Sequence, residues 1–365
     1  MNARAASSAS TTREHRFPWR WRLADLGRVR RHGRTVFSCF ACGGGSSMGY
    51  KLAGYEVLGN VEIDPRIAAV YRQNLHPRHS FVMDVRDFLK LPDAKIPPEL
   101  LDLDVLDGSP PCSTFSMAGK REDGWGKQKR FAEGQALQRL DDLFFTFIAI
   151  AERLKPRVVI AENVKGLTVG SARGYVHEII GGFKAAGYES QVFLLDASRM
   201  GVPQRRERVF FIARRQDLNL PQVKLSFREP PIPFGEVRTV EGVTPERGWK
   251  YMSLLRHRRR SDAKIGDICM RLCGRLSGFT RPIYWDDAPA LTLSASGVCY
   301  RGADGMAVSA GDVVNVSTFP QDYAFGNRSP RFICGMSVPP VMAAQVAAAV
   351  AEQCLGVPAP AGGFE

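Results

Sequence analysis

The spacing of apolar and polar residues predicts alternating strands and helices over the first two thirds of the chain. Short apolar runs, typical of buried strands, lie at residues 35–40, 55–62, 81–85, 105–108, 157–162, 190–195 and 208–213. Helix patterns stand between some of them, at residues 45–53, 65–74 and 137–154. This alternation predicts an α/β fold with a doubly wound, mostly parallel sheet.

The alternation stops near Leu225, and this break predicts the division of the chain into domains. Residues 226–280 are rich in Pro, Gly and Arg, and they include a basic run at residues 256–260. A second apolar helix, predicted at residues 341–353, is expected to return to the sheet. We therefore predict a main domain of residues 35–225 plus 330–365. Residues 226–329 are predicted to form a smaller domain and hinge.

Residues 1–34 differ in composition from the rest of the chain. They begin with an Ala/Ser/Thr-rich run and hold nine Arg against one Glu and one Asp. We expect a basic, flexible tail that is either simply solvated or contacts phosphate groups without sequence preference. An amphipathic targeting peptide is the other interpretation.

Composition narrows the class of protein. The 365 residues are 44% hydrophobic, which excludes a collagen, a coiled coil and a wholly disordered chain. The net charge of +13, from 50 basic and 37 acidic residues, favours a polyanionic partner such as nucleic acid. No apolar run reaches the length of about 18 residues that a membrane span needs.

The eight cysteines do not form a metal-binding pattern. Cys39 and Cys42 make a single C-x2-C pair, and Cys269 and Cys273 make a C-x3-C pair, but no histidine or second close pair completes either. We therefore expect no metal. No secretory signal precedes them, so the expected location is a reducing cytoplasm.

The first candidate site is a glycine turn between the first strand and the helix after it. Its sequence is Phe40-Ala41-Cys42-Gly43-Gly44-Gly45. Glu62 ends the next predicted strand, where folds of this kind often hold a ribose diol. Asp84, at the end of the third, is placed to bind an adenine amino group. The pattern predicts a nucleoside cofactor and suits S-adenosylmethionine and NAD equally.

The second candidate is a cysteine at the end of a buried strand. Cys112 follows Gly108-Ser109-Pro110-Pro111, in which two prolines stiffen the backbone. A cysteine held rigidly at the carboxyl edge of a sheet is a candidate nucleophile. A buried structural cysteine explains this segment equally well.

Two further motifs place charged residues beside predicted strands. Glu162, in Ala161-Glu162-Asn163-Val164, is a candidate acid for a ring nitrogen, or a solvated loop residue or helix cap. Arg206 and Arg208 alternate in Gln204-Arg205-Arg206-Glu207-Arg208, so in a strand they face one side together with Gln204. They are candidates to bind a carbonyl oxygen or phosphates, or are solvated residues at a strand end.

Taken together and in this order, the four motifs resemble those of the bacterial DNA cytosine-5 methyltransferase family. The resemblance covers residues 35–213 and 289–349, and two elements in the second range agree with it: Phe319-Pro320-Gln321-Asp322-Tyr323 and Ser337-Val338-Pro339-Pro340. It implies a Rossmann-like methyltransferase domain with a small target-recognition domain. It also implies S-adenosylmethionine as cofactor, double-stranded DNA as substrate and a monomeric enzyme of restriction-modification type.

The resemblance assigns roles to individual residues. Cys112 supplies a thiolate that attacks carbon 6 of a flipped-out cytosine, and Glu162 binds the N3 and amino edge. Arg208 contacts the O2 carbonyl, and Arg206 orients the site. Residues 118–130 correspond to a mobile loop that closes over the base. The residues implied to bind the cofactor are Phe40, Gly43, Gly44, Gly45, Glu62, Ile63, Asp84, Pro111, Leu143 and Val338.

Two departures from the family pattern concern the cofactor pocket. Cys42 stands where the family usually has glycine, so we expect it to narrow the turn. Met336 stands where the family usually has an asparagine that helps to fix the cofactor pocket. The absence of this asparagine predicts an altered affinity for the cofactor.

Three other functions compete with this interpretation. One branch of the family methylates tRNA with the same motifs, but it is not expected to need a small domain with an arginine run. A catalytically inactive binding protein is expected to lose Cys112 or Glu162, and both are present. A nicotinamide oxidoreductase explains the glycine turn and Glu62, but neither the Pro-Pro-Cys motif nor the arginines near residue 206.

Overall fold

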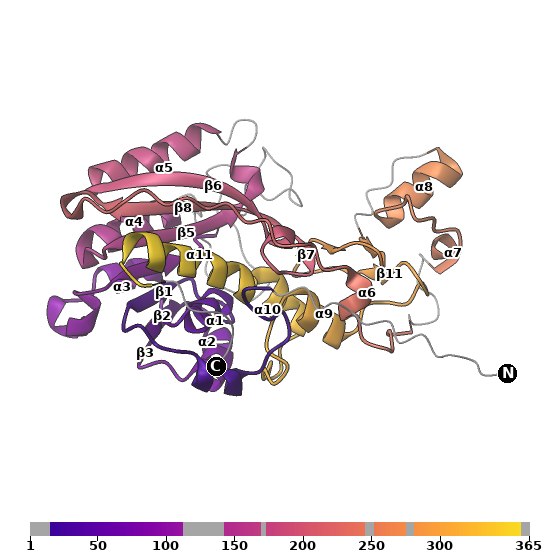
Figure 1. The fold of residues 1–365 in the computed structure, drawn as a ribbon, viewed down its shortest axis with the longest axis horizontal. Helices are drawn as coiled ribbons and strands as arrows, with labels where there is room; N and C mark the ends of the chain where they lie inside the picture. Colours follow the sequence, from indigo (N-terminus) through magenta and orange to yellow (C-terminus); the bar gives the residue numbers. More distant parts are fainter. Residues whose placement is uncertain (1–14, 112–141, 169–172, 245–251, 275–280, 359–365) are drawn as a thin grey trace.

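The computed structural model describes residues 15–111, 142–168, 173–244, 252–274 and 281–358. A seven-stranded sheet stands at its centre, in the order β3-β2-β1-β4-β5-β8-β6 (Figure 1). Strand β8 runs antiparallel to β5 and β6, and the other neighbouring pairs are parallel. This confirms the doubly wound, mostly parallel sheet. The strands are β1 Thr35–Cys39, β2 Glu56–Glu62, β3 His79–Val82, β4 Val105–Gly108, β5 Val158–Val164, β6 Tyr188–Asp196 and β8 Glu207–Arg215.

Helices cover both faces of the sheet because its strands are apolar on both sides. One apolar cluster includes residues of α1, α2 and α11, and the other includes residues of α3, α4 and α5. The helices on the first face are α1 Gly45–Leu52, α2 Pro65–Leu75 and α11 Pro340–Cys354. Those on the second are α3 Val85–Leu89, α4 Asp142–Leu154 and α5 Arg173–Ala185. The molecule therefore has three layers.

Helix α11 is strongly apolar, and it lies inside the fold. Residues 330–354, which also include α10 Pro330–Met336, are long and apolar enough for a membrane span. However, 89% of the most apolar stretch is buried within the structure. This burial is what a core helix of the α/β fold requires, in agreement with the prediction that it packs on the sheet.

The order of the strands fixes where a ligand is expected. Successive strands run outward from β1 in one direction through β2 to β3, and from β4 in the other to β5. The strand order therefore reverses between β1 and β4, and the next described helices, α1 and α4, lie on opposite faces of the sheet. Open α/β sheets bind ligands at such a switch point. The glycine turn follows β1 and the Pro-Pro-Cys motif follows β4.

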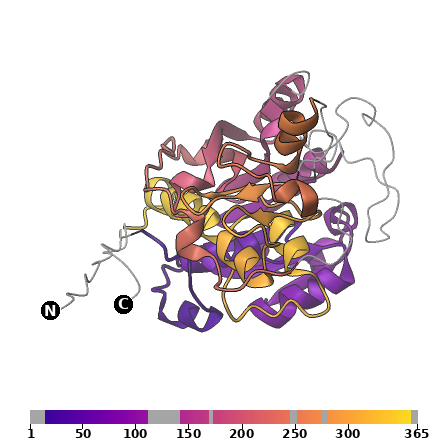
Figure 2. The same cartoon turned by 90° about the vertical axis from the view of Figure 1, so that its right-hand side faces the viewer.

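A smaller unit with its own apolar core projects from the sheet (Figure 1). Figure 2, viewed from that side, has this unit toward the reader. Its core consists of Leu255, Ile265, Ile268, Ile283, Tyr300 and Ala307. Its elements are α7 Met252–Leu255, α8 Ile265–Cys273, β9 Ile283–Tyr284 and β11 Tyr300–Arg301.

The segments between the two cores are joined by polar contacts. Strands β7 Gln204–Arg205 and β10 Ala290–Leu291 pair in parallel, and α6 Phe234–Val237 lies beside α9 Ala310–Val316. Arg301 and Asp312 form an ion pair of 2.6 Å with both side chains fully buried. Removing either partner leaves a buried charge unpaired, which costs about 3–5 kcal/mol. The ion pair therefore fixes the smaller unit to α9.

The N-terminal segment corrects one expectation. Residues 15–34 are not a loose tail: Phe17, Trp21 and Leu26 are buried in the main core, and residues Leu23–Arg28 form a 3-10 helix, η1. The Trp21 indole donates a hydrogen bond of 2.9 Å to the Thr318 carbonyl. The aromatic residues among the arginines anchor the segment, a signal that charge counting alone misses. Residues 1–14 lie outside the described part.

The boundaries of other elements differ from expectation in a few places. The strand predicted at residues 81–85 is β3, which ends at Val82, because Asp84 caps α3 by accepting a hydrogen bond from the Arg86 amide. The short α3 and the amphipathic α5 were not predicted. Of the helix predicted at residues 137–154, the part before Asp142 lies outside the described residues. The other 3-10 helices in the described part of the chain are Asp93–Lys95, Pro98–Leu100, Lys165–Thr168, Ala197–Arg199 and Gln216–Leu218.

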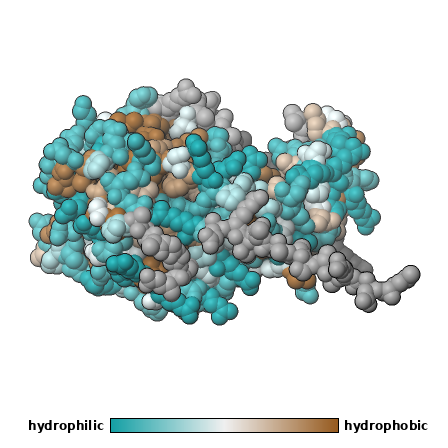
Figure 3. Space-filling model, viewed as in Figure 1, coloured by the Kyte–Doolittle hydropathy of each residue, from teal (hydrophilic) through white to brown (hydrophobic). Residues whose placement is uncertain are grey.

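The surface is mostly hydrophilic on the face shown in Figure 3. Apolar residues gather over the edge of the sheet formed by β6 and β8, where Leu194 is exposed. Most other large apolar side chains of the described residues are buried in the interior.

Candidate active site

The glycine turn after β1 has a backbone conformation that L-residues rarely adopt. Phe40, Cys42 and Gly44 all have positive φ angles, of 56°, 46° and 80°. A non-glycine residue in this region costs on the order of 1–2 kcal/mol. Cys42 therefore holds a left-handed position at the place where the family usually has glycine. Its amide donates a hydrogen bond of 2.9 Å to Glu62, which stabilises the strained turn.

The glycines of this turn are needed by the protein itself, before any ligand is considered. A Cβ atom at Gly43 would overlap Ile333 of α10, and one at Gly45 would overlap the Val338 carbonyl. Tyr323 donates a hydrogen bond of 2.6 Å to the Gly43 carbonyl. The turn thus packs against segments almost 300 residues later in the chain, including the predicted cofactor residue Val338.

Two carboxylates stand beside the turn, at the ends of neighbouring parallel strands. Glu62 ends β2 and accepts hydrogen bonds from the amides of Cys42 and Asp64, at 2.9 and 3.0 Å. Burial raises the pKa of Glu62, and the backbone hydrogen bonds oppose this rise. Asp84 follows β3, and each of its oxygens accepts a hydrogen bond from Arg86. Burial opposes the ionisation of Asp84, but the bonds from Arg86 prevail and lower its pKa.

The two carboxylates, Glu62 and Asp84, can accept hydrogen bonds from a nucleoside. Each carboxylate oxygen has two lone pairs, so Glu62 and Asp84 retain acceptor capacity for a ribose diol or an amino group. Phe40 is half-buried at the end of β1, and Leu143 is buried on α4. Ile63 is half-buried directly after Glu62. The residues present therefore fit the adenosine part of a nucleoside cofactor.

The loop that leads to Cys112 is fixed up to its last described residue. β4 ends at Gly108, and Pro111 is half-buried. The Asn163 side chain donates a hydrogen bond of 3.1 Å to the Pro110 carbonyl. Cys112 and the loop predicted at residues 118–130 lie outside the described residues. The role of Asn163 was not predicted, although its position in the third motif next to Glu162 was the signal for it.

Glu162 and Arg208 form an ion pair on the neighbouring strands β5 and β8. The Arg208 Nε lies 2.9 Å from a Glu162 carboxylate oxygen, and both side chains are almost nine-tenths buried. Burial lowers the pKa of Arg208, although the Glu162 charge and hydrogen bond act in the opposite direction. The pair puts a carboxyl acceptor next to a guanidinium donor.

Arg206 acts within the protein. Its guanidinium donates hydrogen bonds to the carbonyls of Leu293, Gly335 and Ser337, at 2.9, 2.9 and 3.1 Å. It stands between β7 and β8 rather than inside one continuous strand, and it is buried. Burial, together with the nearby charge of Arg208, lowers its pKa to about 9. Arg206 therefore joins the end of the sheet to Leu293, between β9 and β11, and to Gly335 and Ser337, which follow the smaller unit.

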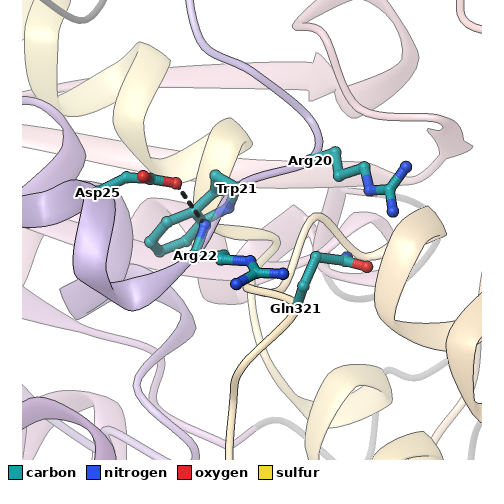
Figure 4. A pocket seen from close by; sticks show the side chains of 5 residues that line it. All are labelled: Arg20, Trp21, Arg22, Asp25 and Gln321. Carbon is teal, nitrogen blue, oxygen red and sulfur yellow. Dashed lines mark hydrogen bonds between the residues drawn. The ribbon is translucent and has the colours of Figure 1, made fainter.

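Two further observations concern ligand sites elsewhere in the described residues. Among the described residues, no group of three or more His, Cys, Asp or Glu side chains is placed to hold a metal ion. A separate hollow of about 360 Å³ lies at the N-terminal segment, lined by Arg20, Trp21, Arg22, Asp25 and Gln321 (Figure 4). In it Asp25 accepts a hydrogen bond of 2.7 Å from the Arg22 amide. It shares no lining residue with the predicted site.

Comparison with known proteins agrees with this arrangement. The family model described as C-5 cytosine-specific DNA methylase matches residues 34–258, more than half of the chain. The chain is 32% identical over 197 residues to the Type II methyltransferase M.NgoPII of Neisseria gonorrhoeae, and these cover 53% of this chain and 50% of that protein. It is 26% identical over 340 residues to M1.HphI of Haemophilus parahaemolyticus, which covers 87% and 86%. The chain thus spans about half the length of the first relative.

Solved structures show the same fold at low sequence identity. One is a prophage-encoded DNA modification methyltransferase of E. coli, with a TM-score of 0.63, 18% identity, and coverage of 89% of this chain and 100% of that one. Another is Spodoptera frugiperda DNMT2, with a TM-score of 0.57, 17% identity, and coverage of 87% and 99%. These structures extend the shared fold over the smaller unit as well as the sheet.

Proposed function

This chain belongs to the C-5 cytosine-specific DNA methylase family, and on that premise we propose that it methylates carbon 5 of a cytosine within a specific double-stranded DNA sequence. The methyl donor in this proposal is S-adenosylmethionine. The observation that carries the proposal is the buried ion pair of Glu162 and Arg208, beside the strand that leads to Cys112.

The ion pair complements one edge of cytosine. Along that edge the ring nitrogen N3 lies between the O2 carbonyl on carbon 2 and the amino group on carbon 4. Glu162 in its acid form donates to N3 and accepts from the amino group, while Arg208 donates to O2. Because both side chains are largely buried, their interactions with a bound base are stronger than in water.

In the proposed reaction, Cys112 starts the chemistry. Its thiolate adds to carbon 6, and the electrons of the 5,6 double bond become available at carbon 5, which is otherwise a poor nucleophile. Glu162 gives its proton to N3 and so offsets the negative charge that the addition brings to the ring. Once carbon 5 carries the methyl group, a base such as water removes the proton from carbon 5. The Cys112 sulfur leaves as a thiolate, the 5,6 double bond re-forms, and N3 returns its proton to Glu162.

The cofactor residues belong to the same proposal. Glu62 would hold the ribose, Asp84 the adenine amino group, and Phe40 the adenine ring. The glycine turn of residues 43–45, with Ile63, Pro111, Leu143 and Val338, would complete the pocket. When bound there, S-adenosylmethionine supplies an electrophilic methyl group. The chain's own part is to orient that group and to exclude water from it.

The substrate and setting follow from the family and the charge. The base must leave the duplex before a thiol can reach carbon 6, and the net charge of +13 favours binding to the phosphate backbone. The relatives are named Type II methyltransferases, so we assign the protein to a restriction-modification context in the cytoplasm of a bacterium, as a monomer.

Bisulfite sequencing of plasmid DNA and of tRNA from cells that express the protein tests this function. We expect new 5-methylcytosine at one short DNA sequence and none in tRNA. Glu162→Gln should lose it, because the amide cannot protonate N3. The matched control is Glu207→Gln, which alters a neighbouring carboxylate paired with Lys165 at the surface. Methylated tRNA with unmodified DNA would favour the RNA-modifying alternative instead.

A further inference from the structure

A row of polar side chains crosses the sheet on the face covered by α1, α2 and α11. Four residues are in register on neighbouring strands: Ser80 on β3, Asn60 on β2, Ser38 on β1 and Asp107 on β4. Strands buried on both faces normally present apolar residues at such positions. Neither polar atom of the Asn60 side chain has a hydrogen-bond partner within the described residues, which costs about 1–3 kcal/mol. The row therefore opposes stability, and a functional reason for it is expected.

Asp107 ends this row, close to the candidate active site. It lies on β4, five positions before Cys112, and only 5% of it is exposed. Its carboxyl group accepts a hydrogen bond of 3.3 Å from the Tyr50 hydroxyl of α1 and another from Ser38. Ser38 in turn contacts Ser47 of α1 at 3.1 Å.

The hydrogen bonds of Asp107 join both halves of the candidate site. Ser38 lies on the strand that leads into the glycine turn, and Tyr50 lies on the helix that leaves it. Tyr71 of α2 extends the connection by donating a hydrogen bond of 2.8 Å to Ser47. One buried carboxyl group thus links the strand leading to the predicted nucleophile with both ends of the predicted cofactor turn.

The charges around Asp107 bear on its protonation state. Within the described residues it forms no ion pair with Lys, Arg or His. The titratable groups that interact with it are Tyr50 on α1, Tyr71 on α2, Cys39 on β1 and Glu162 on β5. Burial raises the pKa of Asp107 to about 7, and the nearby Glu162 adds to the rise, whereas the hydrogen bonds from Ser38 and Tyr50 oppose it.

We propose that Asp107 is a positioning residue that holds the Cys112 strand and the glycine turn in alignment only while its carboxyl group is neutral. An ionised Asp107 is a buried, unpaired charge next to Glu162, and such a charge is stabilised only if water enters or the strand ends separate. Either change displaces the loop that starts at Gly108. This role rests on the proposed function, and it concerns a residue to which that function assigns no contact with substrate.

The test compares turnover of wild type and Asp107→Asn between pH 6 and pH 8, with saturating DNA and S-adenosylmethionine. Asparagine keeps the shape and an acceptor for Tyr50 but cannot ionise. For a group that titrates near pH 7, the neutral fraction falls about tenfold over this range. The ratio of wild-type kcat to Asp107→Asn kcat should fall by about the same factor. A ratio that does not change with pH would overturn the proposal.

Two further variants separate positioning from stability. Asp104→Asn alters another buried carboxylate, which lies directly before β4 and pairs with Arg34 and Arg157. The ratio of wild-type kcat to Asp104→Asn kcat should not depend on pH. Tyr50→Phe removes one of the two hydrogen bonds and should lower kcat while the pH dependence remains. The same pH-dependent ratio in Asp104→Asn would contradict the proposal. If wild type transferred no methyl group at all, the proposed function would fail instead.

Discussion

Two arginines of the same motif, Arg206 and Arg208, have different binding partners in this protein. Arg206 and Arg208 are two positions apart and both carry a guanidinium, yet Arg206 binds three backbone carbonyls and Arg208 pairs with Glu162. The alternation of residues predicted that both face one side, but not what each one contacts. The partners of Arg206 lie 87 to 131 positions away in the sequence. Such partners follow from the fold rather than from local pattern.

The raised pKa of Asp107 also predicts how the stability of the protein depends on pH. Its folded-state pKa of about 7 exceeds the ordinary value of 3.8, so folded Asp107 keeps a proton that the unfolded chain loses between these values. Relative to Asp107→Asn, the free energy of unfolding of wild type should therefore fall as pH rises from about 4 to about 7, by up to about 1.4 kcal/mol per pH unit, and then level off.

Urea denaturation of both proteins across this range measures that difference. Glu62 and the buried tyrosines are common to both proteins, so their titration cancels. A difference that is constant from pH 4 to pH 7 would mean that Asp107 titrates normally in the folded protein. That result would also remove the electrostatic basis of the pH-dependent positioning.

The arginine run of residues 256–260 is less uniform than its sequence indicates. Arg258 donates to the carbonyls of Gly302, Leu255 and Ala303, and Arg260 pairs with Asp287. Arg256 and Arg259 are exposed and form no ion pair within the described residues. A surface loop thus divides its arginines between holding the smaller unit together and facing solvent.

This division predicts which arginines bind DNA phosphates. Changing both Arg256 and Arg259 to Ala should weaken binding to all sequences alike and lower the slope of log affinity against log salt by roughly one for each phosphate group that the variant no longer neutralises. Arg258→Ala is the matched control: it should lower the melting temperature and leave the salt slope of the folded protein unchanged. Fluorescence anisotropy over a salt series measures the slope. An unchanged slope in the double variant, or a change of preference at one base, would contradict this assignment.

The secondary-structure elements were predicted well where the apolar pattern was long and buried. The strands of the sheet and helix α11 fall within a few residues of their expected positions. For the central strands the reason is burial on both faces, which gives continuous apolar runs. The short α3 was missed because its start depends on a single cap, the Asp84 carboxylate. Residues 15–34 were misjudged because three buried apolar side chains, rather than the surrounding arginines, determine where that segment lies.

The whole molecule brings the two halves of the site together through residues far apart in the sequence. The glycine turn packs against α10 and Tyr323. Arg206 joins the sheet to Leu293, between β9 and β11, and to Gly335, after the smaller unit. The order of the motifs along the chain predicted the family, and the site residues that it implies stay a prediction. The motifs did not predict that Cys42 adopts a left-handed conformation or that Asn163 holds the Pro110 carbonyl, because both depend on three-dimensional packing.

The proposed methyl transfer depends on a covalent bond between Cys112 and carbon 6 of cytosine. Fluorine at carbon 5 cannot leave as a cation, so DNA that contains 5-fluorocytosine at the recognised site should trap the adduct once the methyl group has been transferred. With S-adenosylmethionine present, we expect a complex that survives SDS and heat, and mass spectrometry should find the base on the peptide that contains Cys112. Cys112→Ser should form no complex but still bind DNA, since a hydroxyl is a far weaker nucleophile than a thiol at neutral pH. Cys273→Ser, which alters an exposed cysteine of α8, should form the complex as wild type does. A cross-link to another residue, or methylation by Cys112→Ser, would contradict the account.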